Sequence, residues 1–109
     1  MLESLLGNRT IERILFFLET YGQGYPKKIS RVFGTSVNGI QQQLKRLEDG
    51  GIVFSSLEGR TRLYGFNPRY PFLKELKLLL QRAIKFLPDK EIEQYYRGRT
   101  RPRKKGKPL

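Results

Sequence analysis

Residues 35–66 of this 109-residue chain read TSVNGIQQQLKRLEDGGIVFSSLEGRTRLYGF, and this stretch decides the fold. Ser36 is a residue type that favours the N-cap of a helix, and the pair Gly50-Gly51 favours helix termination. The apolar side chains between these signals recur at helical spacing and share one side: Val37, Ile40, Leu44 and Leu47. The pattern predicts a helix that packs its apolar side on a core.

The opposite side of this predicted helix is polar. It carries Asn38, Gly39, Gln42, Lys45 and Arg46, with Gln41 and Gln43 on its flanks. Asn and Gln amides pair with adenine in the DNA major groove, whereas Lys and Arg contact phosphates. The helix N-terminus at Ser36 is also suited to a phosphate. This face therefore predicts contact with double-stranded DNA; a solvated face with no partner is the alternative.

A β-hairpin is predicted directly after the helix. Residues 52–57 and 60–66 are β-prone, and Glu58-Gly59 forms the turn between them. By strand alternation, Arg60 and Arg62 share a face with two aromatic residues closer to the core. The arginines lie near the tip and are predicted to reach DNA phosphates or an adjacent minor groove. Ordinary solubilising charge on an edge hairpin is the alternative.

The composition restricts the possible functions. The chain has no Cys and no His, which excludes disulfides, thiolate chemistry and imidazole metal ligands. Its 22 Lys and Arg against 10 Asp and Glu give a net charge of +12, which favours a polyanionic partner. The acids form no evident catalytic pair, so we expect no enzyme activity, cofactor or metal. No apolar run approaches the ~20 residues of a membrane span.

Two shorter helices are predicted before residue 35. Asn8 is a suitable N-cap for the first, whose apolar residues recur up to Leu18 before a Tyr21-to-Gly24 stop. A second helix over residues 27–33 ends at Gly34, and Thr35 completes a tight turn into the third helix. Helix, short turn, helix is the arrangement that lays a second helix in a major groove.

A long helix is predicted over residues 71–87. Its apolar residues cover an arc of roughly 160°, wider than the ~100° stripe that contacts one core. We predict dimerisation through this arc, by Phe72, Leu76, Leu79, Leu80, Ala83 and Leu87. Packing within the molecule, against the leucines of residues 1–7 and two phenylalanines, is the alternative. A further short turn is expected over residues 90–96, where Tyr95 and Tyr96 cover the core.

The last residues differ sharply in composition. Residues 97–109 contain seven Lys and Arg and no acid, among Gly and Pro. Such a run cannot bury a core, so it predicts a disordered basic tail that contacts phosphates non-specifically, or alternatively a solubility feature. The remaining 96 residues hold 15 basic residues against 10 acidic ones and are therefore basic in their own right.

Taken together, the motifs resemble the winged helix-turn-helix of the ArsR (arsenic-repressor) type of bacterial and archaeal regulators. The resemblance covers roughly residues 8–87 and is carried by Leu44-Lys45-Arg46-Leu47-Glu48, Gly51-Ile52-Val53 and the wing from Gly59 to Tyr64 closed by Phe66-Asn67-Pro68. It implies a dimer that binds operator DNA as a repressor. Many members sense metals through Cys or His, and this chain has neither.

The predicted fold is mainly α with a small β-hairpin, in one winged helix-turn-helix domain (residues 1–96) followed by the tail (97–109). The predicted function is sequence-specific DNA binding and transcriptional regulation in a prokaryotic cytoplasm, associated with the nucleoid. A winged-helix protein-interaction module and a non-specific RNA- or DNA-binding protein are the alternatives. The predicted DNA-binding residues are Thr35, Ser36, Asn38, Gly39, Gln41, Gln42, Lys45, Arg46, Arg60 and Arg62.

Overall fold

The computed structural model describes residues 1–97. Its elements, in chain order, are α1 (Glu3–Leu6), α2 (Arg9–Tyr21), β1 (Gln23–Gly24), α3 (Pro26–Phe33), α4 (Val37–Asp49), β2 (Val53–Glu58), β3 (Thr61–Phe66), α5 (Leu73–Lys85) and α6 (Asp89–Tyr95). The strands form one antiparallel sheet in the order β1-β3-β2. The predicted mainly helical fold with a β-hairpin wing is confirmed. None of the helices within residues 1–97 has the length and apolar character needed to cross a bilayer.

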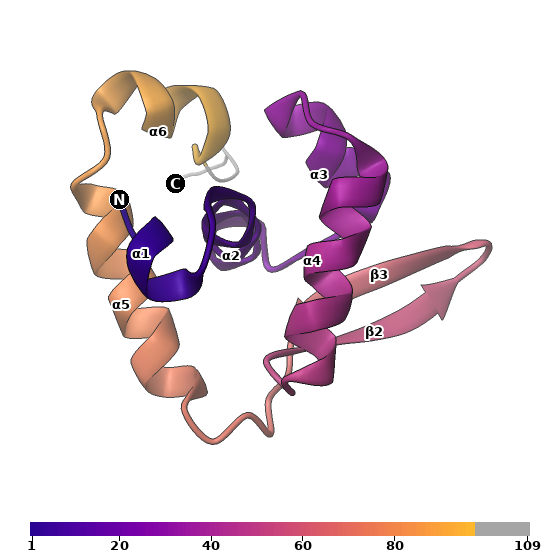
Figure 1. Cartoon of the computed structure of the whole chain (residues 1–109). Helices are drawn as coiled ribbons and strands as arrows, with labels where there is room; N and C mark the ends of the chain where they lie inside the picture. The colour runs from indigo at the N-terminus through magenta and orange to yellow at the C-terminus, as the bar shows by residue number, and fades with distance from the viewer. Residues whose placement is uncertain (98–109) are drawn as a thin grey trace, which may run out of the picture.

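Helix α2 lies at the centre of the molecule, between the α5–α6 side and the α3–α4 side (Figure 1). The Asn8 side chain accepts a hydrogen bond from the Ile11 amide at 2.8 Å, which confirms the predicted N-cap. The helix buries seven of its residues, and the largest, Phe16, is almost fully enclosed. Because α2 has few exposed positions, it forms the core on which the other helices pack.

The α3–α4 turn has the predicted form. Gly34 adopts a left-handed conformation with φ of 66°, which favours glycine. The Ser30 hydroxyl donates to the Thr35 carbonyl at 2.8 Å, and Ser36 caps α4 by accepting from the Gly39 amide at 3.0 Å. These contacts fix the angle at which α4 leaves the turn. At the other end of α4, the left-handed residue is Gly51, with φ of 79°.

The hairpin joins the core at its base and extends away from it, as Figure 1 shows for β2 and β3. The register runs from Val53 opposite Phe66 to Glu58 opposite Thr61. Asn67 closes the base, since its amide N–H donates to the Ile52 carbonyl at 2.9 Å and its side chain donates to the Gly51 carbonyl at 3.0 Å. The base of the wing is therefore fixed to the end of α4.

Strand β1 was not predicted from the sequence. Gln23 and Gly24 pair with Gly65 and Tyr64 of β3, so the hairpin is the larger part of a three-stranded sheet. A Cβ on Gly24 would lie 2.6 Å from Cε1 of Phe17, which is too close for two non-bonded carbon atoms. Glycine at position 24 thus lets the strand pass directly over α2.

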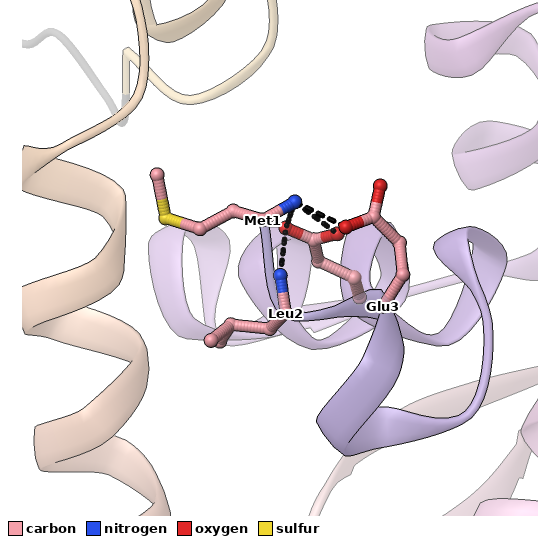
Figure 2. Close-up of polar contacts among 4 residues, drawn as sticks. Met1, Leu2 and Glu3 are labelled. Carbon is pink, nitrogen blue, oxygen red and sulfur yellow. Dashed lines mark hydrogen bonds and ion pairs between the residues drawn. The ribbon is translucent and has the colours of Figure 1, made fainter.

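Helix α1 was also not predicted from the sequence. Figure 2 shows Met1, Leu2 and Glu3, the start of this segment, with their polar contacts. The amide of Leu2 donates to the Glu12 carboxylate at 3.2 Å, and the Met1 ammonium group lies 3.3 Å from the same carboxylate. The Met1 ammonium also contacts Glu3, and this hydrogen bond raises the pKa of the ammonium. These contacts give the buried Glu12 side chain its partners and hold α1 against α2.

Part of the predicted dimer surface on and beside α5 is buried within the molecule, so that part of the prediction is wrong. Leu80 has no exposed surface, and Ala83 and Leu87 are buried in the same core as α2. Leu76 is partly buried and packs against that core, whereas Phe72 and Leu79 are exposed. The buried side chains have almost no surface left for a second molecule, so they pack within the molecule.

Helix α6 covers the open end of the core. Tyr96 is buried and packs edge-on to Phe16, with ring centroids 5.5 Å apart. Tyr95 lies against Phe33 at 5.0 Å, so the predicted covering of the core by both tyrosines is confirmed. Pro88 occupies the N-cap position of this helix, and Asp89 is its first residue. The predicted tail lies outside the described residues, apart from its first residue.

Candidate nucleic-acid interface

Helix α4 exposes the polar face predicted from its sequence. Its apolar residues Ile40, Leu44 and Leu47 are buried. The opposite side is exposed over Ser36, Asn38, Gln41, Gln42, Lys45 and Arg46, while Gly39 is half-buried. Thr35 is half-buried, and its hydroxyl is enclosed without a hydrogen-bond partner in residues 1–97. Amide and cationic groups therefore stand together on the free side of one rigid helix.

One flank of α4 leans on the start of α2. The side-chain amide of Asn8 donates to Oε1 of Gln43 at 3.2 Å, so Gln43 is used within the molecule. Further along this flank, the Arg46 guanidinium lies 3.7 Å from the position that a Cβ would take on Gly7. Arg46 thus lies at the edge of the face, beside the α1–α2 turn, and Gln42 is closer to its middle.

Lys45 pairs with Asp49, at 3.6 Å between Nζ and Oδ2. Both side chains are exposed, and an exposed pair of this kind contributes little to stability. The ammonium group can therefore exchange Asp49 for a DNA phosphate at little cost. Asp49 lies on the last turn of α4 and adds a negative charge at that end of the face.

Arg62 lies on the side of the wing that faces α4. The Ser55 hydroxyl donates to the Glu48 carboxylate of α4 at 2.9 Å, and the same oxygen accepts from Nη1 of Arg62 at 3.1 Å. This Glu48–Ser55–Arg62 chain ties β2 and β3 to the helix. Arg60 is exposed near the tip. The structure thus joins Arg62 to the flank of α4 at Glu48, which lies one helical turn from Lys45.

The tie through Glu48 and Ser55 was not predicted. Alternation from the buried Val53 places Ser55 on the inner face of β2, which is a weak signal in the sequence. Leu57 is a second residue without a predicted function: it pairs with Arg62 across the strands and is 63% exposed. It adds an apolar group beside the arginine at the free end of the wing.

This surface combines two kinds of group that protein–DNA contacts use. Amides that donate and accept hydrogen bonds can recognise base edges, and cations can neutralise phosphates. An exposed helix face with a two-stranded ribbon beside it is an arrangement that can place the helix in a major groove and the ribbon on the flanking backbone. Within residues 1–97 no cluster of acidic side chains is arranged to hold a metal ion.

Comparisons with known proteins identify the fold. No family model and no curated protein matches the chain. Among solved structures, the apo form of a Lactococcus lactis ZitR double mutant matches with a TM-score of 0.57 at 22% identity, over 84% of this chain and 75% of that one. In another structure of that mutant, the match has a TM-score of 0.52 at 23% identity and covers 77% of this chain but only 64% of ZitR.

Two further structures are similar over most of the chain. A MarR-family transcriptional regulator from Rhodococcus matches with a TM-score of 0.55 at 16% identity, over 84% of this chain and 71% of that one. A MepR mutant from S. aureus, bound to an oligodeoxyribonucleotide, matches with a TM-score of 0.54 at 16% identity, over 85% and 75%. The family named among these structures is MarR rather than ArsR. At these identities the likeness concerns the fold, and the chain has the winged helix-turn-helix fold of such regulators.

Proposed function

We propose that this chain binds double-stranded DNA sequence-specifically and regulates transcription, as a repressor. The observation that carries the proposal is the tie between the wing and α4. The Glu48–Ser55–Arg62 chain holds a wing arginine beside the helix whose free side exposes amides and cations. The similar fold of the MepR mutant, whose structure is bound to an oligodeoxyribonucleotide, supports the same function.

Each group has a distinct task in this proposal. Asn38 and Gln42 lie one helical turn apart at the middle of the face and recognise base edges in the major groove. Gln41, on the flank, contacts a neighbouring base. Lys45 and Arg46 contact phosphates on either side of the groove, and Gly39 allows the helix to approach closely. Thr35 and Ser36 place the N-terminus of α4 against a phosphate.

The wing extends the contact beyond the major groove. Arg60 and Arg62 lie on the backbone or in the adjacent minor groove, where a narrow groove attracts arginine. The basic residues 97–109 add phosphate contacts that do not depend on sequence. In this scheme base recognition resides in α4, and the other elements mainly contribute affinity.

Selection of duplexes from a random pool at moderate salt tests the proposal directly. We expect a preferred duplex sequence, and the absence of any preference would contradict it. With that duplex, Gln42→Ala should lower the preference over a scrambled duplex by about 1–3 kcal/mol. Lys45→Ala should weaken both duplexes equally and reduce the salt slope by about one. Lys74→Ala, an exposed lysine on α5, is the matched control and should leave binding unchanged.

We further propose that the chain acts as a homodimer. Leu79 of α5 and the two residues that flank this helix, Phe72 and Phe86, are exposed. Their seven-residue spacing corresponds to one side of the helix. A two-fold dimer would set paired α4 helices about one DNA turn apart, ~34 Å, on a palindromic site. The proposed interface keeps Phe72 and Leu79 from the sequence-based prediction, adds Phe86 and leaves out the buried residues.

Sedimentation equilibrium tests the dimer. Leu79→Glu should shift the chain towards monomer and weaken binding to a palindromic duplex more than to a single half-site. Leu78→Glu is the matched control, because Leu78 is also exposed but lies about 100° away around the helix. Equal effects of the two substitutions would exclude the proposed interface.

The finer assignment to the ArsR type is part of this proposal and rests on the motifs in residues 36–68. Because the chain has no Cys and no His, metals held by those side chains are not among its proposed effectors. A regulator of this kind acts at chromosomal DNA, in a prokaryotic cytoplasm.

A further inference from the structure

A cavity of about 500 Å³ lies apart from the candidate DNA interface. It is lined by the end of α2, by β1, by α3, by β3 and by α6, and by none of the residues predicted to contact DNA. Its volume falls within the roughly 300–1,000 Å³ typical of small-molecule sites. Nothing in the proposed DNA function requires this cavity.

The walls of the cavity are aromatic. Phe17 is buried and forms the inner wall, while Tyr21 and Tyr25 are 38% and 37% exposed. The rings of Phe17 and Tyr21 lie 4.7 Å apart, and the Tyr21 hydroxyl donates to the Tyr95 carbonyl at 3.0 Å, which holds its ring in place. Leu63 completes the apolar lining. Surfaces of this kind favour a flat ring that can stack.

The polar groups of the cavity indicate a charged ligand. Among residues 1–97, Lys28 is the one lining residue with a charge, and no acid lines the cavity with it. In the part of the chain that the structure describes, no carboxylate forms an ion pair with Lys28. Gln23 and Gln94 each add an amide that both donates and accepts hydrogen bonds. The site therefore suits an anion whose ring carries donors and acceptors.

We propose that this cavity binds a nucleoside monophosphate. The base stacks on Tyr21 and Tyr25, the amides of Gln23 and Gln94 hydrogen-bond to its edge, and Lys28 pairs with the phosphate. Stacking of the base on an aromatic side chain and the charge-assisted contact with the phosphate are the two main sources of affinity. This proposal is independent of the DNA function, because the two surfaces share no residue.

Isothermal titration of the full chain with AMP, GMP, CMP and UMP tests the site. We expect saturable binding of at least one nucleotide at one site per chain. Lys28→Gln should weaken it at least about ten-fold, since it removes the charge-assisted contact. Lys27→Gln is the matched control: Lys27 is the neighbouring exposed lysine of α3, does not line the cavity, and should leave the affinity unchanged. Tyr25→Ala should weaken the same nucleotide about five-fold or more.

Three results would overturn the proposal. The first is the absence of saturable binding by all four nucleotides at millimolar concentration. The second is an equal loss in the Lys27 and Lys28 variants, which would indicate general attraction to a basic surface. The third is binding of benzoate as tight as that of the nucleotide, since a benzoate ring offers no edge to the glutamine amides.

Discussion

Replacing Tyr96 with phenylalanine should stabilise the protein. Tyr96 is 5% exposed, and its hydroxyl has no hydrogen-bond partner within residues 1–97. A buried polar group without a partner costs about 1–3 kcal/mol. Phenylalanine keeps the edge-on contact with Phe16 and the packing on Phe33, and removes only the oxygen. We expect Tyr96→Phe to raise the free energy of unfolding by about 1–2 kcal/mol at pH 7.

The difference should grow at alkaline pH. Burial, and secondarily the negative charge of Glu91, raises the pKa of Tyr96 in the folded protein. In the unfolded chain the phenol ionises near pH ~10. Between the two pKa values the unfolded state binds fewer protons than the folded state, so stability falls as the pH rises. The loss amounts to at most about 1.4 kcal/mol per pH unit above pH 10, and the phenylalanine variant does not share it.

Urea unfolding of both proteins from pH 7 to pH 11, followed by circular dichroism, measures these differences. Every other side chain is the same in both proteins, so the difference between the two curves isolates Tyr96. A wild type more stable than the variant at pH 7 would show that the hydroxyl has a favourable partner. A difference that stays constant up to pH 11 would refute the argument from the raised pKa.

Four further substitutions test the scaffold of the interface. Leu44→Ala, at a position without exposed surface on α4, should lower the free energy of unfolding by about 2–5 kcal/mol, measured by urea unfolding. Gly51→Ala should destabilise by about 1 kcal/mol or more because φ is 79°, whereas Gly50→Ala, with φ of −82° and ordinary contacts, should be neutral or slightly stabilising in the same assay. Ser55→Ala should cost about 1 kcal/mol of stability and weaken duplex binding measured by fluorescence anisotropy, and unchanged binding would show that the wing needs no tie to α4.

The fold was largely predictable because its signals are local. Caps at Asn8 and Ser36, the left-handed turn at Gly34 and the stop at Gly50-Gly51 each act through the nearest turn of backbone. Helix α1 has four residues and strand β1 has two, which is too short for any periodicity to appear. Their positions depend on contacts with distant residues that the sequence alone does not give.

The candidate site was predictable in part for a related reason. On an amphipathic helix, burial of one side exposes the other, so the exposure of Asn38, Gln42 and Lys45 follows from the pattern. Which apolar residues of α5 are buried and which are exposed does not follow from the sequence pattern, because a monomer core and a dimer interface both use apolar side chains. Leu80 and Leu79 are adjacent and chemically identical, yet only Leu80 is enclosed. The contact from Glu48 to Ser55 depends on the angle between helix and wing, which no local pattern specifies.

Because of the hydrogen bond from Arg62 to Ser55, the two wing arginines lose different amounts of side-chain conformational entropy on binding. Ordering a flexible side chain on binding costs about 0.5–1.5 kcal/mol. For Arg62 much of this loss occurs when the protein folds, because Ser55 already restricts its rotamers. No hydrogen bond holds the Arg60 side chain in residues 1–97, so its rotamers would be lost only at the moment of association. The same residue type, two positions apart, thus provides one preorganised contact and one adaptable contact.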